Sequence, residues 1–379
     1  MAEALKHFFS KALVAKLSRS LADVCAGFDE RAFQKRATRG LDDLELLARG
    51  RHLMEAMHAH LPGRYEEQLS LILRSLGAAN TTDENQGGGM TPFFYLPHVS
   101  FVATYGVDDF DRSMAAQVEL TKRFTCEWSV RPFLERYPER SFEMLKSWTA
   151  HEDPHVRRLV SEGTRIRLPW ASRIPDWERD LDKIVQLLER LKDDSSSMVR
   201  RSVANNLNDI AKVDPARVVV IVKRWLGGAS AERRALVEHA LRTLVKRGDK
   251  SALALLGFGG SPIVAIERVR FEPKRVLIGE SVRVSFDVVS RSKLRQSLLV
   301  DLVVHFAKAN GNSRKVFKLK RVELALGETA SFSKLVSLAV YTTRKPYAGR
   351  HEVELLLNGY PAALGDFTVV TASSSRRPS

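Results

Sequence analysis

The segment Ser161–Trp170 (SEGTRIRLPW) concentrates the residue types best suited to chemistry. A helix that ends at Gly163, a residue suited to a helix C-cap, would let the chain pass through two arginines to Trp170. Carboxylates such as Glu162 stabilise positive charge, and an indole face attracts a cation by about 0.5–2 kcal/mol. Two interpretations of Trp170 stay open: an indole that faces a groove, and, favoured by spacing alone, an indole that covers the core of a helical repeat.

Two more acidic residues could share such a site. Glu127 lies in the run CEWS, and Asp209 ends the run NNLND. Metal chemistry finds little support, because the two cysteines, Cys25 and Cys126, form no Cys-x-x-Cys pair and the ten histidines form no ligand cluster. His155 is therefore interpreted as a residue of the repeat surface rather than as a ligand. No metal and no cofactor are expected.

Three consecutive glycines, Gly87–Gly89, end a polar run that begins at Asn80. The Lys-Ser or Lys-Thr that a phosphate-binding P-loop requires does not follow them, so a phosphate cradle is not predicted here. The run is expected to be an exposed and mobile loop.

A short internal repeat predicts the helices that hold the candidate residues. The run DPHVRR at 153–158 resembles the run that ends in MVRR at 198–201, and a third copy is SAERR at 230–234. The arginine pairs lie 43 and then 33 residues apart, within the range of HEAT-like helical repeats. Each copy has an Asp or Ser that suits a helix N-cap, and Pro154 suits a first helical turn.

Each predicted repeat helix carries a polar stripe with a spacing of four residues, so that its members share one face. The stripes are Arg158 and Glu162; Arg201, Asn205 and Asp209; and Arg234, Glu238 and Arg242. The opposite face of the second helix is an apolar core stripe of Val199, Val203, Leu207 and Ile210. Stacked repeats would align the polar stripes on one concave surface. Periodicity alone favours the alternative, a solvated face with ion pairs worth about 0.3–0.5 kcal/mol each.

The net charge of +15 and the pI of about 9.9 favour an anionic partner such as nucleic acid or an acidic membrane. The excess lies late in the chain: from residue 261 onward 20 Lys and Arg face 10 Asp and Glu. Lysines interrupt every apolar run near the N-terminus, and no run approaches the length of a membrane span. A soluble cytoplasmic protein without a membrane partner is expected.

The texture of the chain predicts two domains and a tail. Residues 1–259 read as helices, with one early helix ending at Leu61-Pro62-Gly63. Residues 262–371 contain about seven short strand-like runs separated by turn sequences such as Asn310-Gly311 and Asn358-Gly359. This pattern is typical of an immunoglobulin-like β-sandwich, here without a disulfide. The fold class is therefore an all-α helical repeat solenoid followed by a small all-β sandwich, with a disordered tail at 372–379.

Four runs resemble the AlkC-type DNA alkylation-repair glycosylases, a HEAT-like repeat family related to AlkD. They are SEGTRIRLPW, the preceding DPHVRRLV, the earlier RFTCEWSVRPFL and the repeat VRRSVANNLNDIAK. A subset of this family carries a C-terminal immunoglobulin-like domain, so the resemblance covers nearly the whole chain. The first run together with VANNLND is fairly specific, whereas Val-Arg-Arg alone is generic.

The resemblance implies a monofunctional glycosylase that excises cationic methylated bases, above all 3-methyladenine and 3-methylcytosine, from duplex DNA. The base would be reached without full flipping, in a duplex whose bending costs on the order of 1–6 kcal/mol. Glu127 and Glu162 then stabilise charge and position a water, with Asp209 nearby and Trp170 against the cationic base or sugar. The residues expected to hold phosphates are Arg158, Arg165, Arg167, Arg201 and Asn205. The protein would act as a monomer, associated with the nucleoid when bound to DNA.

A second function stays open. A helical scaffold joined to a binding sandwich could hold DNA or an acidic protein without catalysis. Acidic residues within an otherwise basic stripe count against pure DNA binding, because they would weaken phosphate affinity.

Overall fold

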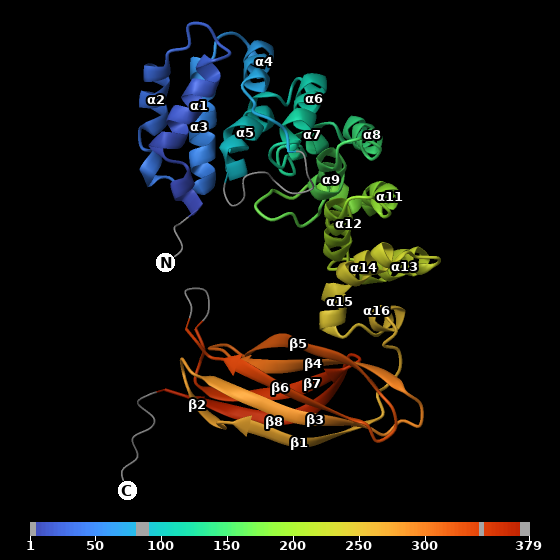
Figure 1. Cartoon of the computed structure of the whole chain (residues 1–379). Coiled ribbons are helices and arrows are strands. Elements are labelled where there is room, and N and C mark those ends of the chain that lie inside the picture. The colour runs from blue at the N-terminus through green and yellow to red at the C-terminus, as the bar shows by residue number, and fades with distance from the viewer. Residues whose placement is uncertain (1–4, 81–90, 341–344, 372–379) are drawn as a thin grey trace. The chain divides into compact units, whose positions relative to one another are not determined.

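The computed structural model describes residues 5–80, 91–340 and 345–371 (Figure 1). The predicted glycine-containing loop falls, apart from Asn80, outside the described residues, and so does the predicted disordered tail. The N-terminal part is helical. Its 3₁₀ segments are η1 (Leu5–Phe8), η2 (Leu41–Asp43) and η3 (Thr91–Tyr95). Its α-helices are α1 (Lys11–Ala22), α2 (Glu30–Thr38), α3 (Leu46–His60), α4 (Tyr65–Arg74), α5 (Leu96–Tyr105), α6 (Phe110–Thr121), α7 (Arg131–Arg136), α8 (Pro138–Trp148), α9 (Pro154–Gly163), α10 (Pro175–Arg179), α11 (Leu181–Leu191), α12 (Ser197–Ile210), α13 (Pro215–Leu226), α14 (Ala231–Ala240), α15 (Arg242–Arg247) and α16 (Lys250–Leu255).

The three repeat helices begin where the sequence predicts. Asp153 accepts a hydrogen bond from the His155 amide, and Ser196 accepts from the first amides of α12. Ser230 accepts from the Arg233 amide at the start of α14. These side chains satisfy amides that have no partner within the helix. The three predicted copies are therefore three capped helices.

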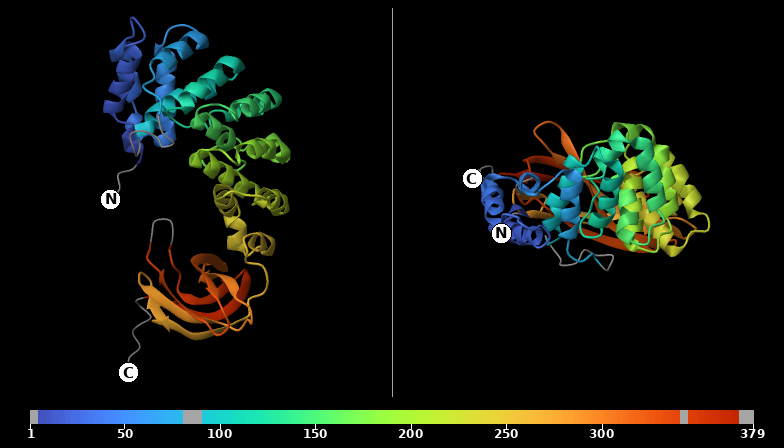
Figure 2. Two further views of the ribbon diagram at one scale, coloured as in Figure 1. Left: turned by 45° about the vertical axis from the view of Figure 1, so that its right-hand side comes forward. Right: turned by 90° about the horizontal axis from the view of Figure 1, so that it is seen from above.

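The repeat helices α9, α12 and α14 pack side by side in sequence order (Figure 2). Helices α8 and α11 form a second row that packs against α9 and α12. The predicted core stripe of α12 faces this interior, because Val199, Val203, Leu207 and Ile210 are fully buried. Paired rows of helices are the arrangement expected of a helical repeat.

Eight strands of the described residues form the C-terminal sandwich. They are β1 (Val264–Glu272), β2 (Arg275–Leu277), β3 (Ser281–Ser290), β4 (Gln296–Ala307), β5 (Asn312–Leu324), β6 (Thr329–Ser337), β7 (Gly349–Leu357) and β8 (Tyr360–Val370). One sheet has the order β1-β3-β6 and the other β2-β8-β7-β4-β5. Only β2 with β8 is a parallel pair among these strands.

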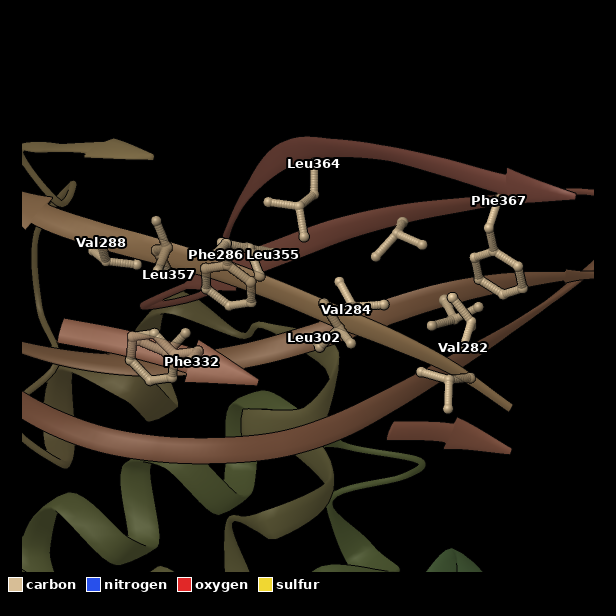
Figure 3. Packing of buried hydrophobic residues seen from close by; sticks show 14 of the residues in the cluster. Val282, Val284, Phe286, Val288, Leu302, Phe332, Leu355, Leu357, Leu364 and Phe367 are labelled. Carbon is tan, nitrogen blue, oxygen red and sulfur yellow. The ribbon is translucent and has the colours of Figure 1, made fainter. Parts of the chain in front are cut away.

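The core of the sandwich lies between the two sheets, as Figure 3 shows. Phe286 of β3 stacks on Phe332 of β6, with ring centroids 5.2 Å apart. The alternation in β3 explains this core, because successive side chains of a strand point to opposite faces. The predicted turns also hold: Asn358 and Gly359 both have positive φ, as a two-residue type I′ hairpin requires. The predicted fold class, helical repeats followed by an immunoglobulin-like sandwich, is confirmed.

The chain forms two compact units, and the boundary between them lies before the point where helices give way to strands. One unit contains the chain up to Asp214 with Trp225–Ala240, and the other contains Pro215–Arg224 with the chain from Leu241 onward. Within the second unit, Lys250 of α16 lies 4.6 Å above the ring of Tyr360. The predicted border at 259–262 thus marks the change of secondary structure, while α15 and α16 belong to the same unit as the sandwich.

Candidate active site

Trp170 has an unusual placement for a tryptophan. Its side chain is 71 % exposed, and its backbone adopts the left-handed conformation with φ of 62°. That conformation is disfavoured for a bulky residue, and strained residues of this kind cluster at functional sites. The interpretation favoured by spacing, an indole that covers the repeat core, is wrong, because a proline and the left-handed turn carry the indole outward.

A pocket of about 430 Å³ lies beside this indole. It is lined by Leu47, Arg51, Pro92, Phe93, Leu96, Ser100, Thr104, Phe124, Thr125, Glu127, Trp128, Pro169 and Trp170. The lining combines aromatic rings with one carboxylate, that of Glu127, and one guanidinium, that of Arg51. Aromatic faces and the Glu127 carboxylate favour a planar cationic group, and Arg51 is the one lining residue whose charge opposes it.

Glu127 belongs to a small ion-pair group at the edge of this pocket. Its Oε2 accepts a hydrogen bond of 2.6 Å from Thr125 Oγ1 and one of 3.0 Å from Arg158 Nη2. The side chains of Glu127 and Arg158 are 19 % and 25 % exposed. Arg158 comes from the polar stripe of α9, so this helix holds Glu127 in place while the carboxylate still reaches the pocket.

A second ion-pair group, built around Arg165, is buried. Arg165 donates to Glu162 and, over 2.8 Å, to Asp209 Oδ2, while Ser202 Oγ donates to the other oxygen of Glu162. Lys212 donates to Asp209 Oδ1 over 2.7 Å. Burial opposes the charged form of Arg165, yet the two carboxylates outweigh it and raise the pKa of the guanidinium.

This placement corrects two expectations. The predicted phosphate contact of Arg165 does not fit, because carboxylates occupy its guanidinium and only 12 % of its side chain is exposed. The solvated-face interpretation of the polar stripes also fails at Glu162 and Asp209, which are 5 % and 0 % exposed. Their ion pairs link α9 to α12 across the segment after Gly163 rather than running along one helix.

The two arginines of each pair make different contacts. The first arginine of each pair holds a loop before a repeat helix: Arg157 binds Asp194 through two nitrogens, Arg200 donates to the Asp194 and Ser195 carbonyls, and Arg233 binds Asp193. The second arginine faces outward. Arg158 pairs with Glu127, whereas Arg201 and Arg234 are exposed and bind no other described residue.

The remaining predicted phosphate contacts differ from one another. Arg167 is exposed and has no partner within the described residues, as a contact awaiting an external anion would be. Asn205 is half-buried, and its Oδ1 lies 3.0 Å from His239 Nε2 of α14. Arg167 and Arg201 are therefore still candidates for phosphate contacts, whereas Asn205 already contacts His239 within the repeat.

Two further residues near the site behave differently from expectation. Gly163 is the last residue of α9 rather than a left-handed cap, and a Cβ there would come within 2.8 Å of Val130 Cγ1. A glycine is needed at this position because a side chain would collide with Val130, and not because the backbone is left-handed. His155 is only 6 % exposed, so its interpretation as a surface residue is wrong. Among the described residues no three His, Cys, Asp or Glu side chains converge as a metal site would need.

Sequence reasoning assigned no role to Thr125, Trp128, Ser202 or Arg131. The first two line the pocket, and Ser202 binds Glu162. Arg131 binds the segment that carries Trp170. Arg131 and Trp128 lie in the run RFTCEWSVRPFL, in which only Glu127 was assigned a role. No helix of the described residues has the length and apolar composition of a membrane span.

Comparison with known proteins places this site in a family. A model of the DNA alkylation repair enzyme family matches residues 124–244, and one of the C-terminal Ig-like domain of the uncharacterised protein YhaZ matches residues 265–371. YhaZ of Bacillus subtilis (strain 168) is 33 % identical over 371 residues, which are 96 % of this chain and 99 % of YhaZ. A solved structure, Pseudomonas fluorescens alkylpurine DNA glycosylase AlkC bound to DNA containing an abasic site analog, is 34 % identical. It superimposes with a TM-score of 0.89 over 97 % of this chain and 100 % of that one.

The chain belongs to the AlkC family of DNA alkylation repair proteins. The resemblance stated from the four sequence runs is thereby confirmed. The segment that matches the repair-enzyme model contains Glu127, Glu162, Trp170 and Asp209 together with every predicted phosphate contact.

Proposed function

We propose that this member of the AlkC family is a monofunctional DNA glycosylase that hydrolyses the N-glycosidic bond of cationic alkylated bases, 3-methyladenine and 3-methylcytosine above all, in duplex DNA. The observation that carries the proposal is that the exposed, strained Trp170 and the carboxylate of Glu127 line one pocket. The solved AlkC relative, which matches along the whole chain, is an alkylpurine DNA glycosylase bound to DNA.

The residue types suit hydrolysis of a cationic nucleotide. A base alkylated at N3 carries a positive charge, so the electron pair of the breaking C1′–N bond neutralises it and no general acid is needed. Water then forms the new bond to C1′ of the oxocarbenium-like sugar and loses a proton. A carboxylate can stabilise the sugar cation and accept that proton. We assign this role to Glu127, which reaches the pocket, and we place Trp170 against the base or sugar.

Glu162 and Asp209 are proposed to act from a greater depth. Both carboxylates are buried and are balanced by Arg165 and Lys212, so they hold the segment after α9 and offer no free carboxylate to a ligand. An exposed indole can reach a lesion that DNA bending uncovers, which supports excision without full flipping.

DNA is proposed to bind to the exposed arginines of the helical part and to the sandwich. Arg167, Arg201 and Arg234 are exposed cations that suit phosphates. In the sandwich, Lys315 of the cation-rich strand β5 and Lys334 of β6 lie 4.8 and 5.5 Å from the Phe317 ring. These contacts would position DNA without reading its sequence.

The deciding experiment measures release of free methylated base from methylated duplex DNA by the purified protein. We expect release by the wild type, and a large loss of release that leaves a measurable single-turnover rate, with retained DNA affinity, for Trp170→Ala. Val213→Ala, which trims another exposed apolar side chain of the helical part, should keep full activity. A wild type that binds DNA in a salt-dependent way but releases no base would instead support the non-catalytic scaffold.

A further inference from the structure

Arg131 is a buried arginine that no carboxylate pairs with among the described residues. It opens α7 and is 3 % exposed. Its Nη1 donates to the carbonyls of Gly163 and Arg165 over 2.9 and 3.0 Å. Its Nε and Nη2 both donate to the carbonyl of Ser172, over 3.0 and 2.7 Å. Burial lowers the pKa of Arg131 to about 10, so the guanidinium remains charged near neutral pH.

These acceptors lie at the two ends of one segment. Gly163 and Arg165 stand where α9 ends, and carbonyls there lack partners within the helix and attract a cation. Ser172 lies two residues after Trp170. The guanidinium therefore closes residues 163–172 into a loop whose ends meet at one side chain. Trp170, with its left-handed backbone, lies within this loop.

A planar fork of donors is needed to hold three carbonyls in this way. Lysine has the same charge but gathers its donors on a single nitrogen, so it cannot reproduce the arrangement. The strained backbone of Trp170 persists only where its surroundings fix it, and Arg131 holds both flanks of that residue. The close approach of Gly163 to Val130, the neighbour of Arg131, brings the end of α9 within reach of the guanidinium.

We propose that Arg131 is a positioning residue: by tying Gly163 and Arg165 to Ser172 it sets the left-handed backbone of Trp170 and so the place of the indole at the pocket. The inference rests on the proposed glycosylase function. It assigns Arg131 no contact with DNA or with the reacting base. Its effect on excision passes through Trp170 alone.

A double-mutant cycle tests this route. Single-turnover excision is measured for wild type, Arg131→Lys, Trp170→Ala and the double variant. Arg131→Lys should slow excision on the order of 10- to 100-fold at unchanged affinity for DNA, since small misplacements at a reacting centre cost that much. In the Trp170→Ala background the same change should cause no further loss. Full activity of Arg131→Lys, or the same fold loss in both backgrounds, would overturn the proposal.

Arg49 offers a matched control. It is 2 % exposed and likewise donates to main-chain carbonyls, here of Lys6, Phe9, Asp42 and Leu44. Arg49→Lys should lower thermal stability as Arg131→Lys does, while excision per folded molecule stays at the wild-type rate. An equal loss of excision for the control would show that any buried arginine has this effect, and would overturn the specific role of Arg131.

Two further measurements keep the proposal testable. If Arg131→Lys fails to fold, insertion of two glycines after Ala171 lengthens the closed loop with Arg131 intact, and excision should fall by a similar factor; unchanged excision would contradict the proposal. If the wild type releases no base, the proposed glycosylase function fails, but the positioning of Trp170 by Arg131 can still be tested. The fluorescence emission of Trp170 is obtained by subtracting the spectrum of the Trp170→Phe protein. It should shift in the Arg131→Lys variant, and an unshifted spectrum would contradict the positioning of Trp170 by Arg131.

Discussion

Helix α9 contributes one residue to each of two acid–arginine groups, which differ in their access to solvent. Arg158 and Glu127 form a partly exposed pair at the edge of the pocket. One turn later, Glu162 joins Arg165 and Asp209 in a buried group. The same residue types therefore serve two purposes. An exposed pair holds a carboxylate where a ligand can meet it, while a buried group ties two helices together because each charge must be matched there.

Among variants of these two groups, Glu127→Gln should have the largest effect on excision. The amide keeps the shape of the side chain but removes its negative charge beside the pocket. We expect excision to fall on the order of 10²- to 10³-fold, the usual cost of losing one electrostatic group. Stability should change by less than about 1 kcal/mol, because the pair is partly exposed. Single-turnover kinetics and urea unfolding measure the two quantities, and a large loss of stability would erase the contrast between the groups.

Glu162→Gln should act mainly on stability. The change leaves Arg165 with one carboxylate in a buried place, and breaking a buried pair costs on the order of 3–5 kcal/mol. Urea unfolding followed by helical circular dichroism measures this cost. A loss below about 1 kcal/mol would show that the Arg165 group behaves like a surface pair. Asp209→Asn offers a second view of the same group, with a loss of similar size expected.

Ser202→Ala removes one donor from the buried group and leaves its charges. The Glu162 oxygen then lacks a partner, and the expected cost is about 1–3 kcal/mol in the free energy of unfolding. The corresponding change in the exposed group, Thr125→Ala, should cost less, because water can replace the hydroxyl. Equal costs for both variants would argue against the difference in access.

Arg201→Ala should have the smallest effect. The side chain is exposed and unpaired among the described residues, so stability should stay within about 0.5 kcal/mol. If it binds a phosphate, the slope of log affinity against log salt should fall by about 1. Arg200→Ala is the internal comparison, because Arg200 holds a loop and its loss should lower stability instead.

The sequence predicted the repeat helices, their caps and the sandwich because those features follow from local rules. Asp153 and Ser196 stand at cap positions, and the alternation in β3 is visible residue by residue. The acidic residues and Trp170 were singled out by residue type, and the family resemblance then gave them their roles. Their different depths could not be predicted, since Glu127 and Glu162 are equally acidic in a sequence and only the packing of α9 on α12 separates them.

Arg131 and Gly163 show why the remaining features of the site could not be predicted from the sequence. The acceptors of Arg131 are main-chain carbonyls more than thirty residues away, and carbonyls leave no trace in residue types. Gly163 matches a common cap pattern, yet its φ is not left-handed and a neighbouring valine explains it. Contacts between side chain and distant backbone require the fold to be known first.

The divided roles of the arginine pairs bear on how such a protein can grow. The second and third copies each carry a first arginine that secures a loop within the array and a second that is left exposed. A duplicated copy would therefore bring one more outward cation, while its first arginine would still need an acceptor in the neighbouring loop, as Arg233 needs Asp193. Adding whole copies would extend the row of exposed arginines that begins with Arg201 and Arg234. The number of these cations could then evolve separately from the chemistry at Trp170.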